Sequence, residues 1–214
     1  DIIKIASCSF TDWPLLERVV KNDKPIIAST AGASIEEIDR VVSFFSHRNK
    51  EFALMHCVAQ YPTPDENINL SQINYLQKRY PNIRIGFSTH ENPAYTKFIS
   101  MAIAMGANIF ERHIGIPTEK YKINNYSSTP EQIDAWLSEA FNSITICGTD
   151  NKRSTVNTNE KENLRSLQRG VYVNRSVNKG EIIKNEDVYF AFPPQENQYT
   201  ANNWSKYLKC EAIK

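Results

Sequence analysis

The chain lacks closely spaced cysteines, an excess of charge of either sign and long apolar segments. Its four cysteines form no C-x-x-C pair, which argues against a structural zinc site and predicts reduced thiols in a cytoplasmic protein. The formal net charge of +1 predicts no basic surface, and therefore no nucleic-acid partner. No apolar run approaches the ~20 residues that a membrane helix needs.

The beginning of the chain also lacks a targeting segment. Asp1-Ile2-Ile3-Lys4 matches neither a secretory signal nor a transit peptide, and it leads directly into a β-branched run. We therefore expect further sequence to precede residue 1 in the full protein. The 214 residues are enough for one large domain, or for one domain followed by a smaller one.

What the sequence does contain is a repeated strand–helix unit. The expected strands are the apolar runs at 2–7, 25–30, 52–58, 83–90 and 108–113. Their near-continuous apolar character indicates burial on both faces, as in a parallel sheet covered by helices. They recur about every 25 residues, the size of one β/α unit. The fold class is therefore α/β, either a (β/α)8 TIM-type barrel with about five of its eight units present, or an open sheet.

Helix signals separate these strands. Thr11 is the expected N-cap of the first helix, and Ser34 with Glu37 forms a capping box for the second. We expect Asn69 to cap the third helix and Pro93 to open the fourth. The expected helices after the first span residues 35–47, 69–80, 93–106 and 129–148.

The pattern changes after residue 148. Residues 1–148 carry the strand–helix repeat, and residues 149–164 are polar without an apolar period, which predicts a linker. Residues 165–214 contain strand-like segments separated by turns. They predict a small β-rich module whose core is marginal for independent stability.

Two histidines end successive expected strands. His90 and His113 each close an apolar run, and a right-handed crossover between the runs places their ends side by side. Ligands bind at this rim of parallel sheets, and two neutral imidazoles there provide half of a divalent metal site. Lys4 lies within an apolar strand, where an unpaired buried ammonium is costly, so we expect it to have a functional role rather than a structural one.

Five motifs in order resemble one family. They are Lys4-Ile5-Ala6-Ser7, Ser29-Thr30-Ala31-Gly32, His56-Cys57-Val58-Ala59-Gln60-Tyr61-Pro62-Thr63-Pro64, Phe87-Ser88-Thr89-His90 and Glu111-Arg112-His113. Together they resemble the sialic acid (N-acetylneuraminate) synthase family, and residues 177–188 resemble its antifreeze-like (SAF) domain. The resemblance covers nearly the whole chain. It implies a (β/α)8 barrel followed by a SAF domain, in a homodimer that swaps that domain.

The resemblance also implies an activity. Enzymes of this family condense phosphoenolpyruvate with an N-acyl amino sugar, with Mn²⁺ or Mg²⁺, and give a nonulosonic acid and phosphate for surface carbohydrate. Small molecules are therefore the expected partners. The residues that match the family pattern are His90 and His113 for the metal, Lys4, Ser7, Ser29 and Ser88 for phosphoenolpyruvate, and the catalytic pair Glu111 and Tyr61 near the sugar. The family's upstream barrel half, with a further glutamate and lysine of the site, is absent from this chain.

Three positions depart from the family pattern. Thr89 and Asn124 stand where the family has aspartates, and Phe192 stands where its SAF domain has an arginine. Each change removes a charge near the expected sugar site. Two alternatives therefore remain open: a non-catalytic sugar- or partner-binding relative that keeps the fold, and a different aldolase-type barrel enzyme that uses phosphoenolpyruvate.

Several of these residues also have structural interpretations. Glu111 can simply pair with a core-facing cation, the three serines can cap the helices that follow their strands, and Tyr61 can pack its loop. His56, in the middle of a strand, is expected to be a hydrogen-bonded core histidine. His47 is expected to close a helix.

Overall fold

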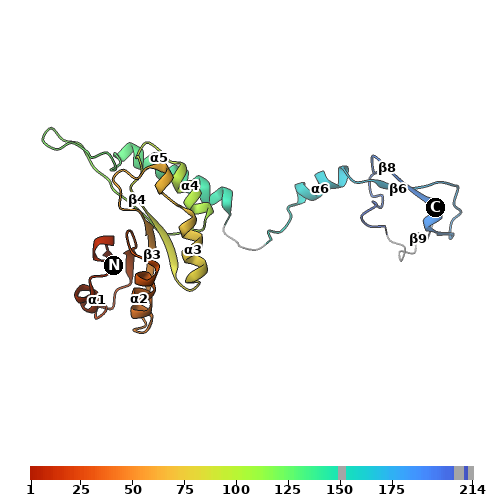
Figure 1. The fold of residues 1–214 in the computed structure, drawn as a ribbon. Coiled ribbons are helices and arrows are strands. Elements are labelled where there is room, and N and C mark those ends of the chain that lie inside the picture. Colours follow the sequence, from red (N-terminus) through yellow and green to blue (C-terminus); the bar gives the residue numbers. More distant parts are fainter. Residues whose placement is uncertain (149–152, 205–209, 212–214) are drawn as a thin grey trace. The chain divides into compact units, whose positions relative to one another are not determined.

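The structure is a computed structural model that describes residues 1–148, 153–204 and 210–211. The chain forms two compact units, Asp1–Thr149 and Asp150–Lys214. In the first unit, strands and helices alternate along the chain (Figure 1). Within the described residues, no helix is long and apolar enough to cross a membrane.

The first unit is built on one parallel sheet. Its strands are β1 (Ile3–Ile5), β2 (Ile26–Ser29), β3 (Phe52–Cys57), β4 (Arg84–Thr89) and β5 (Phe110–Arg112). Each strand pairs in parallel with the next along the chain, in the order β1-β2-β3-β4-β5. The predicted parallel sheet is confirmed, and its curled, sequential arrangement is that of part of a TIM-type barrel.

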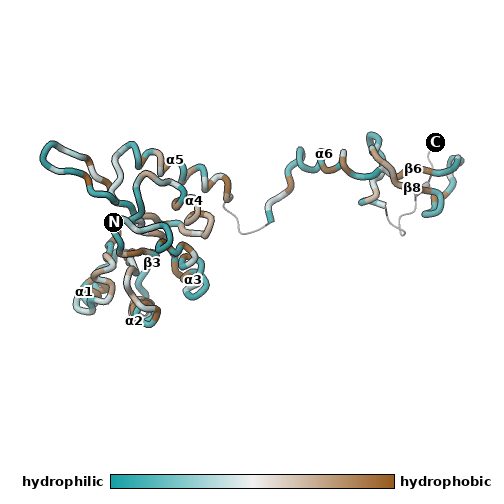
Figure 2. The backbone as a smooth tube through the Cα atoms, turned by 45° about the horizontal axis from the view of Figure 1, so that its top comes forward, coloured by the Kyte–Doolittle hydropathy of each residue, from teal (hydrophilic) through white to brown (hydrophobic). Residues whose placement is uncertain are grey.

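Helices cover the outside of this sheet. They are α1 (Trp13–Val19), α2 (Ile35–Ser46), α3 (Ser71–Arg79), α4 (Lys97–Ala104) and α5 (Pro130–Cys147). Figure 2 shows them arranged in an arc around the strands. The predicted capping box of α2 is confirmed, because the Glu37 amide donates to Ser34 Oγ and the Ser34 amide donates to a Glu37 carboxylate oxygen.

Three predicted helix starts are wrong. Asp12, not Thr11, caps α1, because its carboxylate accepts a hydrogen bond from an amide in the first turn. Asn69 has a left-handed φ of 48° and forms a turn before α3, so it is not the cap. Pro93 precedes α4 by several residues, because the Asn92 side chain accepts from the next-but-one amide and holds a turn there.

The core lies between the sheet and the helices. Leu54 and Ile85 on the strands pack with Leu16, Val41 and Ile73 of α1, α2 and α3, all of them at most 1% exposed. Alternate residues of a strand point to opposite faces. The residues between these core positions therefore face the inside of the curved sheet.

Gly86 permits the close approach of β4 and β5. A Cβ atom at this position would lie 2.4 Å from the backbone oxygen of Ile109 and 2.4 Å from the Met55 sulfur. No larger residue fits there without displacing backbone. The spacing of the two strands that lead to His90 and His113 thus depends on this glycine.

The second unit contains α6 (Thr158–Ser166) and the strands β6 (Gly170–Val173), β7 (Ile182–Ile183), β8 (Val188–Ala191) and β9 (Cys210–Glu211). β6 pairs with β8 and β7 with β9, both antiparallel. The predicted linker at 149–164 overlaps α6, which the Asn157 side chain caps by accepting from the Glu160 amide at 2.7 Å. The sequence signal of this helix is its cap, since it has no apolar stripe.

Candidate active site

The structure brings all eight predicted site residues to one cavity. This cavity has a volume of about 470 Å³ and lies at the carboxyl ends of β1 to β5. Its lining includes Lys4, Ser7, Ser29, Tyr61, Ser88, His90, Glu111 and His113, together with Tyr126 and Cys57. Cross-strand register explains the grouping, since Ser88 lies opposite both Cys57 on β3 and Glu111 on β5.

A charged centre lies inside the cavity. The Lys4 ammonium donates to Ser29 Oγ at 2.9 Å and lies 3.1 Å from a Glu111 carboxylate oxygen. Ser88 Oγ donates to the same carboxylate oxygen at 2.8 Å. Glu111 therefore does pair with a cation, as its structural interpretation expects. The side chains of Lys4 and Glu111 remain 32% and 41% exposed, so both are open to a ligand in the cavity.

The hydroxyl groups of the three serines are used differently. Ser7 Oγ accepts from the Ala31 amide at 3.1 Å, which ties the end of β1 to the end of β2. Ser29 Oγ accepts from Lys4, whereas Ser88 Oγ donates to Glu111. Ser7 and Ser29 therefore keep their own hydrogen for a further acceptor.

The two imidazole rings lie close together, with centroids 5.1 Å apart. His90 is buried and His113 is exposed. His90 Nδ1 lies 3.0 Å from the Val58 carbonyl oxygen. We therefore assign the proton to Nδ1, which leaves a lone pair on Nε2. Burial lowers the pKa of His90, and the neighbouring His113 lowers it further.

The donor set fits a divalent cation in part. A neutral imidazole whose second nitrogen donates to a backbone carbonyl is the usual form of a metal-bound histidine. No cluster of three or more His, Cys, Asp or Glu residues suited to a metal exists among the described residues. His90 and His113, whose rings lie side by side, are the residues that could hold such a cation through two ring nitrogens.

Aromatic rings form one wall of the cavity. The Tyr61 ring lies 4.5 Å from the His90 ring and 5.1 Å from the Tyr126 ring, and Tyr126 lies edge-on to His113 at 5.2 Å. Tyr126 was not predicted from the sequence. Its loop returns to the sheet edge because the Ser128 amide donates to the His113 carbonyl at 2.9 Å.

The positions that depart from the family pattern have different surroundings. Asn124 Oδ1 accepts from the amides of Tyr126 and Ser127, at 3.1 and 2.8 Å, and so shapes the loop that carries Tyr126. Thr89 is buried on the helix side of the sheet, where its hydroxyl accepts from Arg112, so it does not face the cavity. Phe192 lies in the second unit and is 64% exposed.

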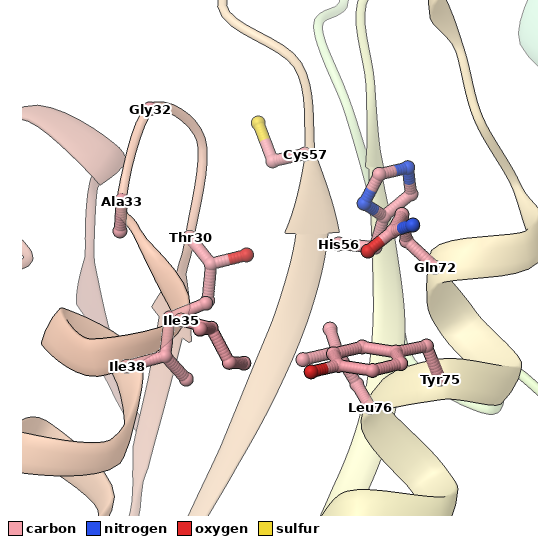
Figure 3. Close-up of a pocket in the computed structure, with 10 residues that line it drawn as sticks. All are labelled: Thr30, Gly32, Ala33, Ile35, Ile38, His56, Cys57, Gln72, Tyr75 and Leu76. Carbon is pink, nitrogen blue, oxygen red and sulfur yellow. The ribbon is translucent and has the colours of Figure 1, made fainter.

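A second cavity, of about 210 Å³, lies between α2 and α3 on the helix side of β3 (Figure 3). His56 points into this layer beside Gln72 and Tyr75. Its Nε2 lies 2.7 Å from the Ile68 carbonyl oxygen, and burial lowers its pKa. The expected hydrogen-bonded core histidine is thus confirmed at His56.

Comparison with known proteins identifies the family. A sequence model of the NeuB family matches residues 1–152. The chain belongs to the NeuB family. The predicted relationship to sialic acid synthases is confirmed with it.

Relatives with solved structures support this assignment. A crystal structure of a candidate spore coat polysaccharide biosynthesis protein E from Chromobacterium violaceum is 51% identical, with a TM-score of 0.92 over 100% of this chain and 65% of that protein. N-acetylneuraminic acid (sialic acid) synthetase from Leptospira borgpetersenii, solved with citrate, is 30% identical, with a TM-score of 0.69 over 76% of this chain and 56% of that protein.

A curated relative gives the same relationship. Spore coat polysaccharide biosynthesis protein SpsE of Bacillus subtilis is 31% identical over 91% of this chain and 56% of its own length. The chain thus spans little more than half the length of such curated relatives.

Proposed function

We propose that this protein condenses phosphoenolpyruvate with an N-acyl amino sugar, giving a nonulosonic acid and phosphate for a surface carbohydrate. The observation that carries the proposal is the single cavity in which an ammonium, serine hydroxyls, a carboxylate and two imidazoles meet. The names of the relatives, a sialic acid synthetase and spore coat polysaccharide proteins, support it.

The phosphate end of phosphoenolpyruvate is proposed to bind beside Lys4. A phosphate trianion requires a cation and hydroxyl donors, and charge-assisted hydrogen bonds are the stronger ones. Lys4 supplies the charge, while Ser7 and Ser29 have free hydroxyl hydrogens. Ser88 acts on Glu111 instead, since it donates to that carboxylate and fixes its orientation.

His90 and His113 are proposed to hold Mn²⁺ or Mg²⁺. When bound, such a cation acts as a Lewis acid that polarises the sugar aldehyde. The hydrogen bond from His90 Nδ1 to Val58 fixes the ring and directs Nε2 away from that carbonyl. With these two histidines as the proposed protein ligands, water and substrate oxygens are proposed to complete the coordination, because the described residues hold no cluster of three or more candidate ligands.

The amino sugar is proposed to lie against the aromatic wall. Tyr61 and Tyr126 place their aromatic rings beside the imidazoles, which suits the apolar face or the acyl group of a sugar. Glu111 is placed to accept a hydrogen bond from a sugar hydroxyl, since its carboxylate faces the same cavity. These three residues are our proposed sugar-side contacts.

The tail is proposed to form a SAF domain that is exchanged within a homodimer in the cytoplasm. The resemblance of residues 177–188 to that domain supports this proposal, as do the antiparallel pairs of the second unit. Sedimentation of the full-length protein tests it. A monomer at micromolar concentration would contradict the exchange.

Phosphate release tests the proposed reaction. The full-length protein is incubated with phosphoenolpyruvate, Mn²⁺ and a panel of N-acyl amino sugars, with His90→Ala as the inactive control. Release that requires both a sugar and His90 is the expected result, and mass spectrometry of the product identifies the sugar. Sugar binding without phosphate release from any member of the panel would instead support the non-catalytic relative.

A further inference from the structure

A buried ion pair joins the two segments that carry the histidines. Glu91 directly follows His90, and Arg112 directly precedes His113. A guanidinium nitrogen of Arg112 donates to a Glu91 carboxylate oxygen at 2.5 Å, and the two side chains are only 3% and 1% exposed. Each partner is thus one peptide bond away from one of the imidazole-bearing residues.

The same guanidinium makes further contacts around both histidines. Its Nη1 atom also lies 3.3 Å from the hydroxyl of Thr89, the residue before His90. Its Nε atom donates to Ser128 Oγ at 2.6 Å. The Ser128 amide in turn donates to the His113 carbonyl oxygen at 2.9 Å. Arg112 therefore contacts the residues before and after His90. It also contacts Ser128, which is hydrogen-bonded to the backbone of His113.

The pair lies on the helix side of the sheet, outside the cavity. The Arg112 guanidinium lies 5.7 Å from the ring of Trp136 on α5. Neither Glu91 nor Arg112 lines the cavity, so neither is placed to touch a ligand there. The pair can therefore affect the site only without touching a ligand there, and the backbone that it shares with the two histidines is the direct connection.

Physical chemistry favours a geometric role. Charges buried in a low dielectric interact strongly, and losing one partner leaves the other uncompensated. The guanidinium is a rigid planar fork, which fixes direction as well as distance. A two-histidine site depends on ring placement to within about 0.5 Å.

We infer that Glu91 and Arg112 are positioning residues that set the spacing and orientation of His90 and His113, and through them the affinity of the site for a divalent cation. This inference rests on the proposed function, because it takes the two imidazoles as metal ligands. It makes the affinity for the cation depend on two residues that do not themselves contact the cation or the substrates. Mutation of a residue that orients a metal ligand typically lowers the affinity for the metal by about 10- to 100-fold.

The test compares Glu91→Gln and Arg112→Lys with the wild type in the full-length protein. The first keeps the size of the side chain but removes its charge; the second keeps the charge but removes the fork. Mn²⁺ affinity is measured by electron paramagnetic resonance of free Mn²⁺, phosphoenolpyruvate affinity by calorimetry, and folding by thermal unfolding. We expect Mn²⁺ affinity to fall by about 10-fold or more in both variants. Phosphoenolpyruvate affinity should stay within about twofold when measured without metal, because Lys4 and the serines do not contact the pair.

A control of equal contact distance is the ion pair Asp39–Arg79, which also has a 2.5 Å contact but is more exposed, at 39% and 41%, and lies between the outer helices α2 and α3. Arg79→Lys should lower thermal stability without changing Mn²⁺ affinity. If Glu91→Gln does not fold, Ser128→Ala replaces it, since it keeps both charges and removes one hydrogen bond to the guanidinium. A severalfold loss of Mn²⁺ affinity is then the expected result.

Three contrary outcomes have different meanings. Folded variants that bind Mn²⁺ within twofold of the wild type would overturn the inference and leave the proposed function standing. A wild-type protein that does not bind Mn²⁺ would overturn the proposed metal role, and the inference with it. A control variant that loses Mn²⁺ affinity as strongly as Glu91→Gln would show a general loss of stability, and would also overturn the inference.

Discussion

Lys4 and Glu111 are predicted to affect phosphoenolpyruvate binding in opposite directions. The Lys4 ammonium lies 3.1 Å from the Glu111 carboxylate, so a phosphate that binds Lys4 must compete with that carboxylate. Lys4→Met should therefore weaken binding, whereas Glu111→Gln should strengthen it. Turnover should fall in both variants. Lys4→Met loses the proposed cation for phosphoenolpyruvate, and Glu111→Gln alters a proposed contact to the sugar.

The expected magnitudes follow from the environment of the pair. A hydrogen bond to a charged group contributes about 1.5–3 kcal/mol, and about 1.4 kcal/mol is a tenfold change in Kd. Lys4→Met should thus raise the Kd for phosphoenolpyruvate by about 10- to 100-fold. The ion pair is partly exposed and is therefore worth at most about 1 kcal/mol, so Glu111→Gln should lower that Kd by up to about fivefold.

Calorimetric titration of the full-length protein with phosphoenolpyruvate measures both effects. Lys97→Met is the matched control, since Lys97 forms an ion pair of similar exposure with Asp65, at 2.6 Å and away from the cavity. The Kd of Lys97→Met for phosphoenolpyruvate should equal that of the wild type. A Lys4→Met variant with wild-type affinity, or a Glu111→Gln variant with weaker affinity, would refute the placement of the phosphate beside Lys4.

Three further predictions concern folding and the sugar side. Gly86→Ala should lower the free energy of unfolding by about 1–3 kcal/mol in urea titrations, because the added Cβ meets backbone of the neighbouring chain segment; unchanged stability would contradict the packing. Hydrogen bonds from its arginine partner lower the pKa of Asp39 from 3.8 to about 2, so its stabilisation is present above pH 4 and is lost as pH falls towards 2. The stability difference between wild type and Asp39→Asn should shrink over that range, and a constant difference would be the contrary result. Tyr126→Ala should raise KM for the sugar severalfold, whereas the exposed control Tyr121→Ala should not; equal effects would exclude the aromatic wall.

Most of the sheet could be predicted from the sequence because its signals are local. The apolar runs that predict the five strands require only neighbouring residues, and their parallel order follows from the intervening helices. The helix starts were less accurate. Thr11 and Asp12 are adjacent residues that both suit an N-cap, and only the path of the chain selects Asp12. The left-handed conformation of Asn69 likewise depends on the turn that precedes α3.

The candidate site was predictable where its residues stand at strand ends. His90 and His113 follow from their positions at the ends of successive parallel strands, a rule that uses sequence order alone. Glu111 was expected only from the resemblance to the family. Tyr126 was missed because its place depends on how the loop from 114 to 128 folds back to the sheet. The Glu91–Arg112 pair did leave a signal, namely opposite charges beside two histidines at the ends of adjacent strands.

A crystal structure of the full-length protein with Mn²⁺ and phosphoenolpyruvate tests the central claim most directly. We predict an anomalous Mn²⁺ signal within bonding distance of ring nitrogens of both His90 and His113. The phosphate should lie in hydrogen-bond contact with Lys4 and with Ser7 or Ser29. Mn²⁺ or phosphate bound outside this cavity, with the cavity itself empty, would contradict the account.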